Sequence, residues 1–349
     1  MSRRDLRLAS GLVLFGYVGS HLANHALGLV STKFAERGLE YALWVWHSMP
    51  GTALLYGAVC IHIALAFDSL WGRRTLRMAP LDLVRVVLGF GIPTLLIGHA
   101  VGTRLAWELY QLSPKYSRVV WSLWATDGQG RQLALLVPGW LHGCFGIHLA
   151  FASRPAYRRL HRLLFALALL LPVLGGLGFL AMGKELAADL AIRGPLDASL
   201  DLPVAASHAL AGLRQTLLAL YFSACASVLL ARAARSWQER RSNALVCIQF
   251  PQRTIRVPRG WTVLEASRSH RLPHLSMCGG RARCSTCRVR VTSGEEQCPP
   301  AGPAEAATLA RVRAPQGVRL ACQLRPEGNI AVVPLLNPGF RLVGDADPV

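Results

Sequence analysis

The stretch LSMCGGRARCSTCRVRV, residues 275–291, places Cys278, Cys284 and Cys287 within ten positions, and Cys322 follows after a further 34 residues. Thiolates are soft, anionic ligands, and four of them complete a [2Fe–2S] cluster. A structural zinc site more often has two Cys-x-x-Cys pairs, whereas only Cys284 and Cys287 form one here. The spacing therefore predicts a [2Fe–2S] site on these four cysteines, with zinc as the alternative.

The residues around these cysteines suit such a site. Gly279 and Gly280 permit a tight loop whose backbone N–H groups can point at sulfur. Cys247 and Cys298 fall outside the spacing and are interpreted as non-ligands, and Cys298 substitutes only if the loop after Cys287 is unusually short. Four arginines favour the reduced cluster, or else form a solvated face or a partner surface: Arg281, Arg283, Arg288 and Arg290.

The sequence on both sides of the cysteines predicts a small α+β domain of β-grasp type. Runs rich in β-branched residues predict strands, and two helix-forming segments lie between them. The predicted strands are 244–250 and 253–258, paired as a hairpin, then 288–294, 319–325 and 329–335, and the predicted helices are 262–270 and 304–312.

Two motifs of this region carry a family resemblance. CGGRARCSTC, residues 278–287, and RLACQ, residues 319–323, resemble the motifs of [2Fe–2S] ferredoxins, and the resemblance covers residues 244–336. The first gap has five residues rather than the plant-type four, so it is nearer the adrenodoxin-like class. The resemblance implies the same four cysteine ligands.

The rest of the chain has the composition of a membrane protein. Of the 349 residues, 52% are hydrophobic and 16% are charged. A window of about 19 residues finds apolar segments long enough to cross a bilayer. We predict six transmembrane helices near 8–30, 45–70, 86–107, 133–152, 163–182 and 209–231. A signal peptide at the first segment is rejected, because five more spans follow and no small-residue cleavage site stands out.

The arginines predict the orientation of these spans. They gather before span 1, between spans 2 and 3, between spans 4 and 5, and after span 6, whereas the other loops carry more acidic residues. The positive-inside rule then places both termini in the cytoplasm. The net charge of +19 does not indicate nucleic acid, because the arginines come in short bursts between apolar runs.

Four histidines lie well inside the first four predicted spans: His21, His62, His99 and His142. At 1.5 Å per residue, His21 and His99 lie at matching depth in the outer half, and His62 and His142 match in the inner half. Two histidines at equal depth on facing helices can hold one haem iron axially. We therefore predict a helical bundle with two b-type haems, the alternative being scattered histidines that hydrogen-bond neighbouring helices.

Two further polar residues are secondary candidates. His148 competes with His142 on the fourth span, but the sequence WLHGCFGIH favours His142, since Gly143 and Gly146 leave room for a flat macrocycle. His148 is interpreted as a propionate or interface partner. Arg214, near the outer end of span 6, either pairs with a haem propionate or extends to the interface.

The first and fourth spans also carry a resemblance. SGLVLFGYVGSHLANH, residues 10–25, and LHGCFGI, residues 141–147, resemble the membrane anchors of diheme succinate–quinone and fumarate–quinone oxidoreductases. In that family four histidines on four core helices bind two haems, the first pairing with the third and the second with the fourth. Six spans rather than five is a departure, so no quinone site is carried over.

A diheme bundle followed by a ferredoxin resembles the N-terminal region of bacterial membrane-bound class III adenylate cyclases. This implies an all-α, cytochrome b-like six-helix bundle at residues 1–235, a linker at 236–243, the ferredoxin domain at 244–336 and a tail at 337–349, in the bacterial inner membrane. It also implies electron exchange with a membrane quinone, regulation of a cyclase domain absent from this chain, and a possible homodimer. The alternatives are an electron carrier between quinone and a soluble redox partner, and an anchor that has lost its cofactors.

Overall fold

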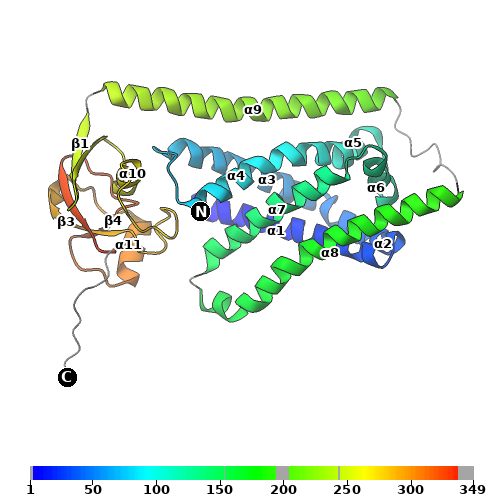
Figure 1. Cartoon of the computed structure of the whole chain (residues 1–349), viewed down its shortest axis with the longest axis horizontal. Helices are drawn as coiled ribbons and strands as arrows, with labels where there is room; N and C mark the ends of the chain where they lie inside the picture. Colours follow the sequence, from blue (N-terminus) through cyan, green and yellow to red (C-terminus); the bar gives the residue numbers. More distant parts are fainter. Residues whose placement is uncertain (1–2, 153, 194–203, 243, 337–349) are drawn as a thin grey trace. The chain divides into compact units, whose positions relative to one another are not determined.

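The computed structural model describes residues 3–152, 154–193, 204–242 and 244–336 (Figure 1). The chain divides into two compact units. The first comprises Met1–Ser69 with Val84–Ala226, and the second comprises Leu70–Leu83 with Ser227–Val349. The predicted tail at 337–349 and residue 243 of the predicted linker lie outside the described residues.

Among the described residues, six helices are long and apolar enough to cross a membrane, which confirms the predicted number and makes this a multi-pass membrane protein. Their apolar windows are only 6–17% buried within the chain, so most of their side chains keep some exposed surface. This is expected where lipid is the solvent. The six helices are α1 (Arg3–Ala26), α3 (Met49–Gly72), α4 (Pro80–Ala100), α7 (Gln129–Phe151), α8 (Pro155–Arg193) and α9 (Val204–Arg241).

Several shorter elements connect these helices, and the sequence analysis did not predict them. The N-cap of α2 is Ser31, whose Oγ accepts a hydrogen bond from the Phe34 N–H at 3.1 Å. Glu185 on α8 accepts from the N–H and the hydroxyl of Thr32, each at 2.8 Å. The connecting elements are η1 (Leu27–Leu29), α2 (Thr32–Trp46), the π-helix η2 (Val101–Leu105), α5 (Ala106–Tyr110) and α6 (Tyr116–Ala125).

The first unit has its densest packing where α1, α2, α6 and α8 meet. Ala35, Tyr116, Val120, Phe179 and Met182 form a buried cluster there. At Gly178 on α8, an added Cβ would lie 2.0 Å from the carbonyl oxygen of His25 on α1. Any larger residue would therefore push the two backbones apart, so glycine sets the close approach of α1 and α8.

The second unit contains a five-stranded sheet with strand order β2-β1-β5-β3-β4. Strands β1 and β5 pair in parallel at its centre, and the other neighbours are antiparallel. The hairpin predicted from the sequence is present, with Val246 opposite Val257. The elements are β1 (Leu245–Gln249), β2 (Thr254–Pro258), α10 (Val263–Ser269), β3 (Arg288–Ser293), η4 (Glu295–Gln297), α11 (Pro303–Arg311), β4 (Val318–Leu320) and β5 (Ile330–Pro334).

Alternating apolar residues of these strands form one core with α10. Ile248, Val289 and Leu320 are fully buried in it. Helix α10 begins with a capping box, in which Thr262 and Glu265 each satisfy a backbone N–H of the other. The predicted strand at 319–325 is shorter than expected: β4 ends at Leu320, and the chain turns immediately before Cys322. The fold thus brings that cysteine back beside the loop that precedes β3.

Candidate cluster site and histidine pairs

The loop between α10 and β3 carries three of the predicted ligands and has an unusual backbone. Gly279, Gly280, Ala282 and Ser285 all adopt positive φ, at 69°, 90°, 52° and 57°. This conformation is rare for residues other than glycine. Repeated within eight residues, it curls the chain so that backbone N–H groups turn toward the cysteine side chains.

The cysteines of this loop and Cys322 lie in two pairs. The N–H of Cys278 donates to the Sγ of Cys284 at 3.3 Å. The thiol of Cys287 hydrogen-bonds Cys322, and the Ala321 N–H donates to the Cys287 carbonyl at 3.0 Å. Cys278, Cys287 and Cys322 are 7%, 1% and 7% exposed, so the site is sheltered from water.

The paired arrangement bears on the choice between zinc and a cluster. A structural zinc ion needs four ligands around one point. A [2Fe–2S] cluster distributes four cysteines over two irons, so it needs two pairs. The thiols therefore fit the two-iron group better than a single zinc ion.

Hydrogen bonds around the sulfurs stabilise negative charge. The Cys284 thiol, helped by the N–H groups of Arg281 and Arg283, lowers the pKa of Cys278 to about 4 in spite of burial. The Arg281 N–H lies 3.3 Å from Cys278 Sγ. The pKa of Cys322 is also lowered, first by the Cys287 thiol and then by Gln323. In each pair, hydrogen bonding thus favours the thiolate of one cysteine, the form that binds metal.

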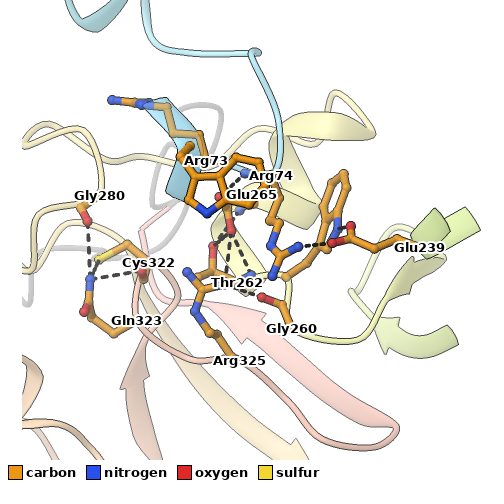
Figure 2. Close-up of polar contacts among 12 residues, drawn as sticks. Arg73, Arg74, Glu239, Gly260, Thr262, Glu265, Gly280, Cys322, Gln323 and Arg325 are labelled. Carbon is orange, nitrogen blue, oxygen red and sulfur yellow. Dashed lines mark hydrogen bonds and ion pairs between the residues drawn. The ribbon is translucent and has the colours of Figure 1, made fainter. Parts of the chain in front are cut away.

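The pKa values of the other two cysteines shift in the opposite direction. The pKa of Cys284 is raised because its proton is shared with Cys278, and that of Cys287 is raised because its proton is shared with Cys322. Around Cys322, the Gln323 amide nitrogen donates to its Sγ at 3.5 Å and to the Gly280 carbonyl at 3.3 Å (Figure 2). Gln323 therefore ties the second pair to the loop of the first.

Helix α11 supports the site from outside. Glu305 is 2% exposed, and it accepts from the Leu320 N–H at 2.7 Å and from Arg319 at 2.9 Å. The hydroxyl of Thr308 donates to the Ala282 carbonyl. These bonds fix β4 and the cysteine loop to one helix. Cys298, the alternative ligand, instead donates to the Gly294 carbonyl at 3.6 Å.

The first unit brings the four predicted histidines together in the predicted pairs. The ring centroids of His21 and His99 are 5.9 Å apart, and those of His62 and His142 are 6.2 Å apart. Metal–imidazole bonds of about 2 Å on both sides of one metal would put two ring centroids roughly 6 Å apart. Both separations are therefore compatible with two axial ligands of one iron.

The ring nitrogens of the second pair can be assigned from their partners. His142 Nδ1 lies 3.1 Å from the Arg85 carbonyl, which can only accept, so Nδ1 carries the proton. Ser10 gives its proton to the Arg7 carbonyl at 3.2 Å, so it accepts from His62 Nδ1 at 3.1 Å. Both rings then have a lone pair on Nε2, as a metal ligand needs.

Glycines make room beside the same rings. A Cβ at Gly89 would lie 2.6 Å from His142 Cε1, and one at Gly11 would lie 3.3 Å from His62 Cε1. Gly11 was expected from the sequence to leave space near His21, whereas the structure places it beside His62, and Gly89 was not predicted. Of the two glycines expected to leave room on α7, Gly143 lies against Phe15, and an added Cβ at Gly146 meets nothing within 4 Å.

A third histidine lies beside the first pair and was not predicted from the sequence. His25 Nε2 lies 3.2 Å from His21 Nε2, and the two ring centroids are 4.6 Å apart. The spacing i, i+4 in HLANH was the available signal, since it places both side chains on one helix face. A metal on His21 Nε2 would have to displace this hydrogen bond, so His25 is part of the first site.

The secondary candidates lie as follows. His148 Nδ1 hydrogen-bonds the Tyr157 hydroxyl at 3.1 Å, within the first unit. Arg214 and Arg131 both lie beside Gly98, where an added Cβ would be 3.5 Å and 3.8 Å from their side chains. Arg131 was not predicted. The Arg131 guanidinium and the side-chain stem of Arg214 thus lie next to the residue that precedes His99.

Comparison with known proteins supports the cysteine site. Residues 248–327 match the 2Fe-2S iron-sulfur cluster binding domain. The Na(+)-translocating NADH-quinone reductase of Methylococcus capsulatus has an F subunit that is 36% identical over 81 residues, which are 23% of this chain and 19% of that protein. Its counterpart in Haemophilus influenzae is 34% identical over 82 residues, 24% of this chain and 19% of that protein. No solved structure matches the chain significantly.

These matches are confined to the sheet domain. The chain spans about a fifth of the length of the curated relatives it matches. The C-terminal domain has a ferredoxin fold and is a [2Fe–2S] cluster-binding domain, which confirms that part of the predicted fold and cofactor set. The matched residues include all four predicted cysteine ligands and none of the histidines.

Proposed function

We propose that this chain is a membrane electron-transfer module that exchanges electrons between a quinone, two b-type haems and a cytoplasmic [2Fe–2S] cluster. The observation that carries the proposal is the presence, in one chain, of a [2Fe–2S] cluster-binding domain and two facing histidine pairs within apolar helices. The name of the matched relatives includes quinone reductase, which supports a quinone as the membrane partner.

The residues of this chain define what each site would do. Cys278, Cys284, Cys287 and Cys322 would hold the cluster, and the N–H donors at their sulfurs would stabilise its negative charge. His21 with His99, and His62 with His142, would each hold one haem. When bound, haem b and the [2Fe–2S] cluster each exchange one electron, whereas a quinol releases two electrons and two protons.

The protein also supplies orientation and shelter. The Arg85 carbonyl and Ser10 orient the rings of the second pair, and Gly11 and Gly89 leave space beside them. Arg131 and Arg214, beside His99, offer positive charge to haem propionates. In this proposal residues 1–235 are the anchor and 244–336 the cluster domain, in a bacterial inner membrane with both termini cytoplasmic.

The test is a cofactor count on the purified full chain. We expect about two b-type haems and one [2Fe–2S] cluster per chain, and reduction of both by a quinol in detergent. A purified chain that shows the cluster but no b-type haem absorbance would overturn the haem part of the proposal and leave the cluster part intact. A preparation with both cofactors that no quinol reduces would overturn the quinone part.

A second candidate is regulation, in which the redox state of the cofactors biases a class III adenylate cyclase domain. The continuity of α9 favours it, because this single helix of 38 residues runs from a candidate span to Arg241, shortly before β1. Such a helix can transmit a conformational bias. Fusion of a cyclase domain after residue 336 distinguishes the two roles. A regulator predicts cyclase activity that changes with quinol reduction, and a carrier predicts unchanged cyclase activity.

A further inference from the structure

Residues 70–83, which join α3 to the start of α4, belong to the same compact unit as the cluster-binding domain. The Arg74 N–H donates to Glu265 Oε1 at 2.9 Å, and the Arg74 guanidinium pairs with Glu239 (Figure 2). Arg77 Nη1 donates to the Ser269 carbonyl at 2.8 Å. This segment, which we call the α3–α4 connection, is therefore bonded to α10 through both its backbone and its side chains.

The last part of the connection reaches the cysteine loop itself. Asp82, in the first turn of α4, forms an ion pair with Arg281 at 2.7 Å. Their side chains are only 6% and 18% exposed. An added Cβ at Gly279 would lie 1.9 Å from Asp82 Oδ2, so the carboxylate abuts the backbone next to Cys278. Charges this poorly exposed are screened little by salt.

Arg281 connects this carboxylate to a cluster ligand. Its backbone N–H donates to Cys278 Sγ at 3.3 Å, and its side chain binds Asp82. The two opposite charges therefore act near the same sulfur. Electrostatically, Asp82 opposes an added electron there, and Arg281 favours it.

We propose that Asp82 and Arg281 are a positioning pair that holds the cysteine loop on the first turn of α4 and sets the reduction potential of the cluster. This inference rests on the proposed function, because it requires the cluster. By reciprocity of coupled equilibria, whatever factor Asp82 imposes on reduction is also the factor by which reduction weakens the hold of Asp82 on the loop. The pair thus makes the attachment of the loop redox-sensitive.

The test is an EPR-monitored redox titration of the purified full chain. Asp82→Asn removes the negative charge and leaves Arg281 uncompensated, so we expect reduction to become about tenfold more favourable, a rise of about 59 mV for one electron. Arg281→Gln keeps the backbone donor but removes the positive charge, so we expect a fall of similar size. The matched control is Glu327→Gln, which removes a carboxylate 61% exposed in an ion pair of the same domain.

Opposite shifts in the two variants support the pair as an electrostatic device. Potential shifts in the same direction in both variants, or shifts no larger than that of Glu327→Gln, overturn it. A loop that is only loosened would shift the reduction potential in the same direction in both variants. Asp82→Glu keeps the charge and is expected to retain the wild-type potential even if Asp82→Asn folds poorly; a shift as large as that of Arg281→Gln contradicts the proposal. A wild-type chain without a [2Fe–2S] signal would instead overturn the proposed function.

Discussion

The two regions of this molecule use apolar residues in opposite ways. In the sheet domain, Val289 and Leu320 are 0% exposed and pack inward around one core. In the helices, Phe165 and Leu230 are 65% and 70% exposed, and the candidate spans are mostly unburied. The first pattern is that of a domain folded in water, and the second is that of helices solvated by lipid.

The candidate ligands of the two regions also differ in the kind of element that carries them. The cysteines lie on loops, where positive φ angles and backbone N–H groups define the site. The histidines lie on helices, whose backbone donors and acceptors are already used, so glycines and ring hydrogen bonds define the site. The comparison teaches that the cysteine site depends on local backbone conformation and the histidine sites on helix packing. A substitution that abolishes cofactor binding at one kind of site should therefore leave the other kind of site occupied.

The largest expected effect comes from replacing one of the four predicted cluster ligands. Cys284→Ser replaces a soft ligand of the first pair with a weak hydroxyl, so we expect complete loss of the [2Fe–2S] EPR signal while the haem spectrum persists. Cys298→Ser is the matched control and is expected to keep the signal. If haem is lost together with the cluster in Cys284→Ser, the two regions do not fail separately.

The next effect concerns the second histidine pair. His142→Leu removes one proposed haem ligand, so we expect loss of about one of two haems per chain, measured by the reduced-minus-oxidised b-type absorbance, with the EPR signal unchanged. His148→Leu, six residues along the same helix, serves as the control and should retain both haems. Equal haem loss in both variants would contradict the assignment of His142.

The two patterns of burial predict different stabilities. Leu320→Ala leaves a cavity in the sheet core, so we expect it to lower the free energy of unfolding of that domain by about 2–5 kcal/mol. Leu163→Ala changes a side chain that is 57% exposed on α8 and should cost less than about 0.5 kcal/mol. Denaturant unfolding in detergent measures both, and a large cost at Leu163 would show that this face packs against protein rather than lipid.

The smallest effect tests the space beside a histidine. Gly89→Ala places a Cβ 2.6 Å from His142 Cε1, so the ring must shift, and we expect partial haem loss or an altered b-type spectrum. Gly91→Ala lies on the same helix with nothing within 4 Å and has the same intrinsic helix preference. An identical outcome for the two variants would remove Gly89 from the proposed site.

Much of this architecture was predictable because its signals are local. The spans follow from apolar runs, and the strands follow from β-branched segments, so both appear near the expected residues. The histidine pairing followed from depth along straight helices. The cysteine spacing identified the cluster-binding domain, which the family comparison supports.

The parts that were not predicted depend on long-range contacts. His25 lies four residues from His21 on one helix face, which was a local signal, but its packing next to Tyr116 and Phe179 requires α1, α6 and α8 to meet. The positions of Gly89 and Arg131 follow from helix packing, which no local pattern encodes. Likewise, the ion pair of Asp82 with Arg281 joins residues 199 positions apart.

That separation also fixes an order of synthesis. At 5–20 residues per second, Asp82 is added to the chain roughly 10–40 s before Arg281. Over that interval the α3–α4 connection lacks the contacts that it makes with α10 and the cysteine loop in the folded protein. Final folding of the cluster-binding domain is therefore the event that captures the connection. The domain that is translated later thus provides the contacts for a segment that lies, in the sequence, between two candidate membrane helices.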